Sequence, residues 1–406
     1  MSSKRHDEAQ LAYPVIALGK SSTNLLGVIR AFGRRGIPVY TLSNSHPNTS
    51  CIRSRYIRER RFIPQWKVED LRQSLLQFGE ALPESEKIVV FPSNDVSLLA
   101  YSSVREALPD KFADSVPSRR LVELSLFKDK FYEYASARNL PHPKSYRMEF
   151  LREREDRLAD YLPFPFVLKP VLSHSFVERF QKKLFEVRNR EDFRRYSQML
   201  AGLGIEMLAQ ELIPGDYYYM VYFYISKDRR TSAVAGFHKV RQTPADYGVG
   251  SLVENYWDEE LVSRTMDLVR SLEYTGIGEV EYKYDTVEKQ YKILEINARS
   301  ITFNRLSAYI GMDLEYLAYL DAIGELVSPQ KLTPRPVAAR WMDFTQDFIS
   351  LLQLKKERKI TLPQILRSYK NLKLDGYFAW DDWSPFLHES CQFVKAGFQR
   401  IWRNSR

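Results

Sequence analysis

The first part of the chain alternates between short apolar runs and segments whose apolar residues recur at helical spacing. Residues 14–18 and 37–42 are typical of buried strands, and residues 25–35 between them are typical of a helix that Gly36 ends. The same order then recurs, with a helical segment at 71–78 before the next apolar run. This alternation predicts a mostly parallel α/β sheet covered by helices over roughly the first 115 residues.

Strands dominate the sequence further along the chain. Residues 206–213, 218–226 and 230–240 have the apolar and β-branched composition of strands. Residues 278–284 and 291–296 follow as a predicted hairpin around a polar turn. We therefore expect a second domain of α+β texture after the first sheet.

The predicted hairpin carries two carboxylates and an amide. Glu281 and Glu295 lie on its two strands, and Asn297 and Arg299 follow Glu295 at intervals of two, so these three share one face. Carboxylate and amide oxygens suit Mg²⁺, and an arginine can bind phosphate with two parallel hydrogen bonds. The alternative is a polar cross-strand face packed by neighbouring lysines.

Here the sequence resembles a known family. Gly278-Glu-Val-Glu281 followed by Leu294-Glu-Ile-Asn-Ala-Arg299 resembles the signature of ATP-grasp enzymes, which include biotin carboxylase and the carbamoyl phosphate synthetase large chain. The resemblance implies that Glu281, Glu295 and Asn297 hold the Mg²⁺ ions (Mn²⁺ being the alternative) that bridge the ATP phosphates. It also implies that Arg299 serves a phosphate or an acyl phosphate.

Three further segments resemble the family in the expected order: residues 127–130, which open a helix, 165–170, a strand, and 209–215, a hinge. The contacts that they imply are Lys130 and Lys169 for phosphate, Glu211 for the adenine amino group, Leu212 and Ile213 for the faces of the base, and Asp216 or Tyr218 for the ribose. The sequence departs from the pattern after Lys169, where biotin carboxylase has a run of glycines and this chain has residues 171–176. We expect Ser173 and Ser175 to contact phosphate there in place of the glycines.

The resemblance implies an α/β and α+β architecture, with a Rossmann-like pre-ATP-grasp domain followed by a two-subdomain ATP-grasp fold. The first domain is expected at residues 1–115. The ATP-grasp domain is expected at 116–325, with subdomains at 116–210 and 211–325. Residues 326–406 form a basic C-terminal extension in this division.

Within the superfamily the chain looks most like predicted ATP-dependent carboligases and carboxylate–amine ligases, including D-aspartate ligase. This likeness rests on residues 36–39, 239–244 and 381–386. It implies that a small-molecule or polymer-linked carboxylate is activated as an acyl phosphate and joined to an amine. Lys239 and Arg241 are candidates to bind the acyl phosphate or the carboxylate, and a charged strand edge is the alternative for both. Biotin-carboxylase-like carboxylation with bicarbonate, or a non-catalytic nucleotide-binding protein, are the rival functions.

The positive charge of the chain is concentrated near its C-terminus. The whole chain carries a formal charge of +9, and residues 331–406 hold 14 Lys and Arg against 7 Asp and Glu, a net charge of +7. This excess is typical of a region with an anionic neighbour, where a membrane surface or an acidic polymer is favoured over nucleic acid, and a merely solubilising surface is the alternative. The helically spaced set Phe393, Val394, Phe398, Ile401 and Trp402 fits packing on the enzyme core or, as the alternative, a peripheral membrane helix.

No stretch approaches the roughly 20 consecutive apolar residues that span a bilayer. Residues 1–10 are polar and of mixed charge, unlike a signal peptide, and the two cysteines are far apart in the sequence. We therefore expect a cytoplasmic protein, peripheral to the membrane if its basic region binds one. The sequence is compatible with an oligomer.

Overall fold

The computed structural model describes residues 12–404 apart from 47, 181, 246 and 327–328, and the side chains of 173–175 and 397–404 also lie outside its description. The chain forms two compact units. The first comprises Met1–Ser115, Glu315–Leu326 and Tyr377–Arg406, and the second Val116–Leu314 and Val327–Gly376. The region 326–406, which we expected as one extension, is thus divided between the two units.

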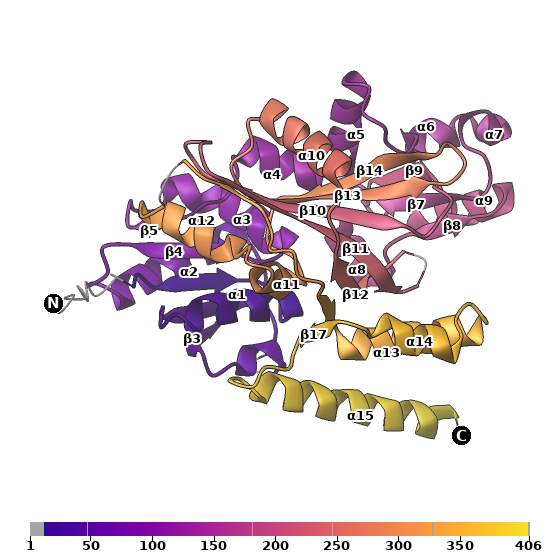
Figure 1. Cartoon of the computed structure of the whole chain (residues 1–406). Coiled ribbons are helices and arrows are strands. Elements are labelled where there is room, and N and C mark those ends of the chain that lie inside the picture. Colours follow the sequence, from indigo (N-terminus) through magenta and orange to yellow (C-terminus); the bar gives the residue numbers. More distant parts are fainter. Residues whose placement is uncertain (1–11, 47, 181, 246, 327–328, 405–406) are drawn as a thin grey trace. The chain divides into compact units, whose positions relative to one another are not determined.

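The first unit contains the predicted parallel sheet (Figure 1), with strand order β3-β2-β1-β4-β5. Its elements are β1 Val15–Leu18, α1 Thr23–Gly33, β2 Val39–Ser43, β3 Ile57–Phe62, α2 Val68–Ala81, β4 Ile88–Pro92, α3 Asp95–Val104, β5 Phe112–Ala113, and most of α12 Leu314–Ile323, with α15 Ser384–Asn404. β1 and β4 are apolar and buried along their whole length, as strands of a parallel sheet with both faces covered must be. The expected α/β class is confirmed here.

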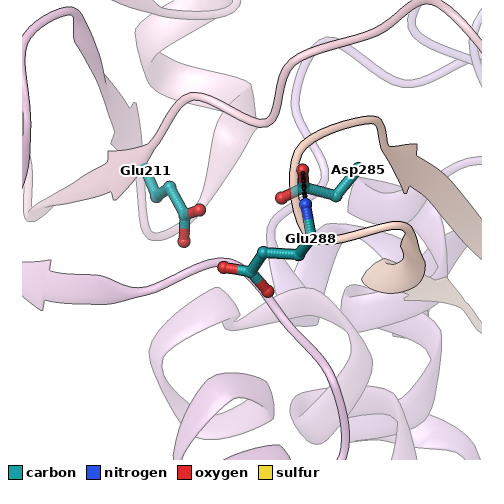
Figure 2. A group of neighbouring side chains, drawn as sticks. All are labelled: Glu211, Asp285 and Glu288. Carbon is teal, nitrogen blue, oxygen red and sulfur yellow. Dashed lines mark hydrogen bonds between the residues drawn. The ribbon is translucent and has the colours of Figure 1, made fainter.

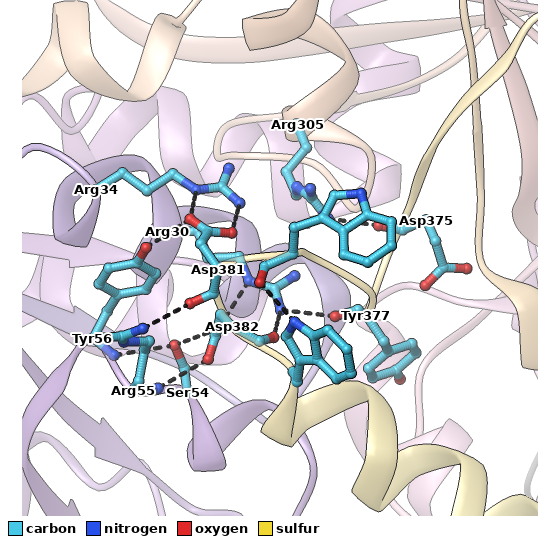
Figure 3. Close-up of polar contacts among 12 residues, drawn as sticks. Arg30, Arg34, Ser54, Arg55, Tyr56, Arg305, Asp375, Tyr377, Asp381 and Asp382 are labelled. Carbon is cyan, nitrogen blue, oxygen red and sulfur yellow. Dashed lines mark hydrogen bonds and ion pairs between the residues drawn. The ribbon is translucent and has the colours of Figure 1, made fainter.

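Two adjacent aspartates tie the last part of the chain to this sheet (Figure 3). The buried Arg30 donates from Nε to Oδ2 of Asp382 over 3.0 Å. Arg34 binds both oxygens of Asp381, at 2.7 and 2.8 Å, and the hydroxyl of Tyr56 donates to Asp381 over 2.6 Å. The Asp-Asp motif near the C-terminus therefore has a structural role, since it fixes the segment before α15 to α1.

The second unit begins with an antiparallel sheet of order β6-β9-β7-β8. Its elements are α4 Arg119–Leu126, α5 Lys128–Ala137, β6 Ser145–Arg147, α6 Met148–Arg152, α7 Leu158–Tyr161, β7 Phe166–Pro170, α8 Ser173–Phe180, β8 Phe185–Val187, α9 Arg190–Leu200 and β9 Met207–Glu211. The segment expected as a phosphate loop is instead the start of α8, because Phe176 and Phe180 pack against Phe185 in the core. The side chains of Ser173 and Ser175 lie outside the described residues.

A larger sheet of eight strands completes the second unit, with the order β14-β13-β10-β11-β12-β16-β17 and β15 beside β11. Its elements are β10 Tyr218–Ile225, β11 Ser232–Thr243, β12 Val249–Asn255, α10 Glu259–Ser271, β13 Gly276–Asp285, β14 Gln290–Asn297, α11 Asn304–Tyr309, β15 Lys331–Leu332, β16 Arg340–Met342, α13 Phe344–Lys356, α14 Leu362–Ser368 and β17 Leu372–Asp375. The predicted hairpin is present as β13 and β14. Thr265 of α10 bonds Tyr282 on one face of β13, which leaves the other face for the acidic residues.

Among the helices that the structure describes, none has the length and apolar character needed to cross a membrane.

Candidate functional site

The predicted metal ligands lie together on the hairpin. Glu281 of β13 stands directly opposite Glu295 of β14, and Glu279 stands opposite Asn297. The amide of Asn297 donates to Oε1 of Glu295 over 3.3 Å. From the neighbouring part of the sheet, Lys239 of β11 donates from Nζ to Oε1 of Glu281 over 2.6 Å. Carboxylate and amide oxygens thus gather beside a cation, a set of donors that suits a hard divalent ion.

The carboxylates on this face titrate differently. Burial, and then the charge of Glu281, raise the pKa of Glu279 to about 8. Burial also raises the pKa of Glu295, but the lysines around it outweigh this effect and bring it down to about 2; they are Lys128, Lys183, Lys239 and Lys169. Glu295 is therefore ionised at neutral pH and Glu279 is protonated. Strong shifts of opposite sign on one strand pair are characteristic of functional sites.

Lys169 of β7 belongs to the same electrostatic environment. Its Nζ donates to Oε1 of Gln210 over 2.8 Å. Removal from water lowers the pKa of Lys169 to about 8, an effect that Lys128 reinforces and that Glu295 and Glu281 oppose. The structure therefore places Lys169 near the carboxylates, as a phosphate-binding lysine would have to be.

Two lysines of α5 lie in different surroundings. Lys130 is 48% exposed and donates to Oε2 of Glu123 over 2.8 Å. The charge of Lys128 lowers the pKa values of both Lys169 and Glu295, whereas Lys130 is not among the main groups that shift either pKa. Sequence reasoning missed Lys128, because the family motif draws attention to the lysine two residues later.

The hinge acid Glu211 is held by two donors. Lys292 donates from Nζ to one of its oxygens over 2.8 Å, and the backbone amide of Lys144 donates to the other over 2.9 Å. Lys292 also bonds Asp285 at 2.9 Å and Glu288 at 3.0 Å. Figure 2 shows Glu211, Asp285 and Glu288, whose oxygens lie within 4.8 Å of one another, as in a metal site. The ammonium of Lys292 already supplies the positive charge of this cluster, and these carboxylates hold the pKa of Lys292 above its usual value although burial lowers it.

The other residues expected around the nucleotide follow Glu211. Ile213 is buried, Leu212 is partly buried and Asp216 is exposed. The ring of Tyr218 is buried, with the ammonium groups of Lys239 and Lys283 each 5.0 Å from its centroid. Tyr218 thus joins the hinge to the lysines of the site, whereas Asp216 points to solvent.

Arg241 lies apart from these residues. Its Nε and Nη2 bind the two oxygens of Asp347 on α13 at 2.7 and 2.8 Å, and its Nη1 donates to Ser368 over 2.5 Å. A β-bulge follows Lys239, so that Lys239 and Arg241 pair with adjacent residues of β12 and face opposite sides of the sheet. The structure therefore gives Arg241 a buried structural partner and keeps only Lys239 at the carboxylates.

Arg299 lies just beyond the end of β14. It donates from Nη2 to Oδ1 of Asn297 over 3.3 Å and from Nη1 to the carbonyl of Ser300 over 3.0 Å. Both bonds hold the guanidinium beside the acidic face. This is the place where a cation could neutralise charge on a transferred phosphoryl group.

Comparison with known proteins agrees with this geometry. The family model for the carbamoyl-phosphate synthase L chain, ATP binding domain, matches residues 251–326. D-aspartate ligase from Enterococcus faecium (strain Aus0004) is 28% identical over 230 residues, which are 53% of this chain and 54% of that protein. The chain thus matches about half the length of this curated relative.

Two solved structures illustrate the likeness in fold. The biotin carboxylase domain of 2-oxoglutarate carboxylase from Hydrogenobacter thermophilus has a TM-score of 0.61 at 14% identity, over 79% of this chain and 72% of that one. L-amino acid ligase from Bacillus licheniformis has a TM-score of 0.56 at 16% identity, over 77% and 74% of the two chains. The family match, the curated relative and the shared fold agree with the resemblance of this chain to ATP-grasp enzymes.

Proposed function

We propose that this protein is an ATP-dependent ligase that activates a carboxylate as an acyl phosphate and joins it to an amine. The observation that carries the proposal is the convergence of Glu281, Glu295 and Asn297 with Lys239 and Lys169 around one face of the β13–β14 hairpin. The likeness to D-aspartate ligase and to L-amino acid ligase supports an amide-type bond as the product.

The donor set fits a divalent ion that binds ATP phosphates. Glu281, Glu295 and Asn297 would hold Mg²⁺, which when bound neutralises charge on the phosphates. The Hydrogenobacter thermophilus structure is a complex with magnesium ADP and bicarbonate, which supports ATP with Mg²⁺ as the cofactors. Mn²⁺ is the alternative ion.

The surrounding residues have separate tasks in this proposal. Lys169 binds phosphate, and Lys128 of α5 does so in addition to, or in place of, Lys130. Glu211 accepts from the amino group of adenine, while Leu212 and Ile213 contact the base and Tyr218 the ribose.

Two cations serve the reacting groups. Lys239, held against Glu281, and Arg299, held against Asn297, stabilise the negative charge of the acyl phosphate.

The proposed reaction has two steps. A carboxylate oxygen of the substrate attacks the γ-phosphorus of ATP, and the bond to the β,γ-bridging oxygen breaks, so that ADP leaves. The amine nitrogen then attacks the acyl carbon, inorganic phosphate leaves, and the amine releases a proton. The protein forms no covalent bond of its own, and its contribution is to position the reactants and to neutralise charge.

An ADP-release assay across paired carboxylates and amines tests this function. We expect release that needs both partners, and we expect Glu295→Gln to abolish it while Glu260→Gln, on the exposed surface of α10, leaves it unchanged. Release that needs bicarbonate in place of an amine would contradict the ligase assignment and favour carboxylation. Full turnover by Glu295→Gln would contradict the metal site.

A further inference from the structure

Helix α13 of the second unit turns its apolar side outward. Phe348, Ile349 and Leu352 are 50%, 42% and 55% exposed, whereas Asp347 and Ser350 are completely buried. In a helix that merely covers a core the apolar stripe faces inward and the polar residues face water. The pattern of α13 is the reverse, so its outer surface is suited to an apolar environment other than the core of this unit.

A polar network explains how such a helix stays attached. Asp347 accepts two hydrogen bonds from Arg241, one of 3.3 Å from the hydroxyl of Ser251 and one of 2.6 Å from the hydroxyl of Tyr369. A buried carboxylate with this many donors fixes the inner side of α13 to β11 and β12. The attachment therefore does not require Phe348, Ile349 and Leu352, which remain on the outer side of the helix.

Helix α14 also exposes apolar side chains. Leu362 and Leu366 are four residues apart, hence on one side of the helix, and each is 67% exposed. Figure 1 shows α13 and α14 next to one another, joined by a short connection. We call the exposed side chains of Phe348, Ile349, Leu352, Leu362 and Leu366, with the basic residues described next, the α13–α14 surface.

The same helices are strongly basic. Between positions 355 and 373 the chain has seven Lys and Arg residues and one acidic residue, Glu357, which gives a net charge of +6. All seven basic residues are exposed. This segment therefore accounts for most of the positive charge of residues 331–406.

We propose that the α13–α14 surface docks on an anionic lipid bilayer. Exposed Leu, Ile and Phe side chains enter the boundary between headgroups and acyl chains, and the flanking Lys and Arg side chains attract anionic headgroups. The apolar and the basic parts together supply the two signals that stable attachment requires. This goes beyond the ligase reaction, because it places the enzyme at a membrane.

The charge also argues against other occupants of this surface. A second copy would bring another segment of charge +6 against the first, and like charges across an interface are unfavourable. An acidic polymer or a nucleic acid would pair with the lysines but would leave the exposed leucines in water. An anionic bilayer satisfies both parts of the surface.

Vesicle co-sedimentation of the full chain tests the proposal. We expect binding to vesicles of phosphatidylcholine mixed with phosphatidylglycerol, little binding to phosphatidylcholine alone, and weaker binding at high salt. Replacing Lys355, Lys356 and Arg358 together by Gln should weaken binding roughly 100-fold, since each basic residue contributes about a fivefold gain at an anionic surface. Replacing Leu362 and Leu366 together by Gln should weaken it about tenfold or more.

Matched controls separate docking from folding. Val287→Gln removes an apolar side chain that is 76% exposed on the β13–β14 turn, and we expect unchanged vesicle binding. All variants should form ADP at the wild-type rate in solution, because none of these residues is at the ATP site. The ligase assay can therefore contradict the proposed function without affecting the membrane proposal, and the vesicle assay can contradict the membrane proposal without affecting the proposed function.

Three results would overturn the proposal. One is a wild-type chain that does not bind the anionic vesicles, or that binds neutral ones equally well. Another is binding that depends on the basic residues but not on the leucines, which would indicate an acidic polymer. The third is a dimer, detected by light scattering, that Leu362→Gln with Leu366→Gln dissociates, which would assign the surface to a second copy.

Discussion

Nζ of Lys239 lies 2.6 Å from Oε1 of Glu281, and both side chains are almost entirely buried. This ion pair joins β11 to the hairpin that carries the remaining acidic residues. Because Glu295 and Glu279 lie on the same face, the lysine is a main source of positive charge for three carboxylates.

Lys239→Met should therefore impair both catalysis and stability. Without the ammonium, Glu281 stays buried without its cation, which typically costs about 3–5 kcal/mol when a buried pair is broken. Loss of one charge-stabilising group should also lower kcat about 100-fold or more. Steady-state ADP release and urea unfolding measure the two effects. Lys227→Met, at an exposed position, should change neither, and wild-type kcat in Lys239→Met would remove Lys239 from the reaction.

Lys128 and Lys130 offer a matched pair of substitutions on one helix. Lys128→Met should lower kcat/KM for ATP by roughly 10- to 100-fold, the usual loss of a charge-assisted hydrogen bond. Lys130→Met should have little effect, because Lys130 pairs with Glu123 on the surface. The opposite outcome would mean that Lys130 leaves Glu123 when ATP binds, and it would return the phosphate role to the residue that the family resemblance indicates.

The sequence predicted the hairpin well because strand periodicity is a local signal. Alternation of side chains is enough to place Glu281, Glu295 and Asn297 on one face, and the register between β13 and β14 then brings them together. The helix motif was less informative. Residues two apart on a helix point in different directions, so a motif with lysines at both positions does not identify which one faces the site.

Two other features depend on contacts that the sequence does not reveal. The bulge after Lys239 turns Arg241 to the opposite side of the sheet, toward Asp347, which is 106 residues away in the sequence. The outward apolar side of α13 likewise depends on that buried aspartate. A periodicity argument places the apolar stripe of a helix on the core, and only the long-range ion pair shows that the core side of α13 is polar.

ATP binding should depend on pH through Lys169. Burial lowers the pKa of Lys169 from 10.5 to about 8, so its positive charge is lost as pH rises through about 8. The affinity for ATP, measured by calorimetry, should fall over the same range. An unfolded chain would hold this proton up to about pH 10.5, whereas the folded chain releases it near pH 8. Through this group, the free energy of unfolding therefore rises with pH between about 8 and 10.5.

The control for this prediction is Lys169→Arg, which keeps its charge at high pH. Lys169→Arg should lose less ATP affinity between about pH 7 and pH 9 than the wild type does, and a loss that remains would come from Glu279, whose pKa of about 8 lies in the same range. If the wild type loses ATP affinity above pH 8 and Lys169→Arg loses it in parallel, another group is responsible. Loss of affinity accompanied by unfolding would also contradict the prediction, because the titration of Lys169 acts in the opposite direction on stability.

The last prediction concerns Lys292, which bonds Glu211, Asp285 and Glu288 together. Lys292→Met leaves these carboxylates without their shared cation, and the hinge acid then loses one of the two donors that fix its orientation. We expect KM for ATP to rise about tenfold or more, as for loss of a charged hydrogen bond, while kcat changes less because the acyl phosphate site is separate.

Lys289→Met, on the same turn but exposed, is the control and should have no effect. Nucleotide selectivity gives a second measurement, since a displaced Glu211 should discriminate less between ATP and GTP. If Lys292→Met lowers the melting temperature but leaves KM and selectivity unchanged, the cluster is only a structural connection within the second unit. Glu211 would then not be the residue that recognises adenine, and that role would pass to backbone groups of the hinge.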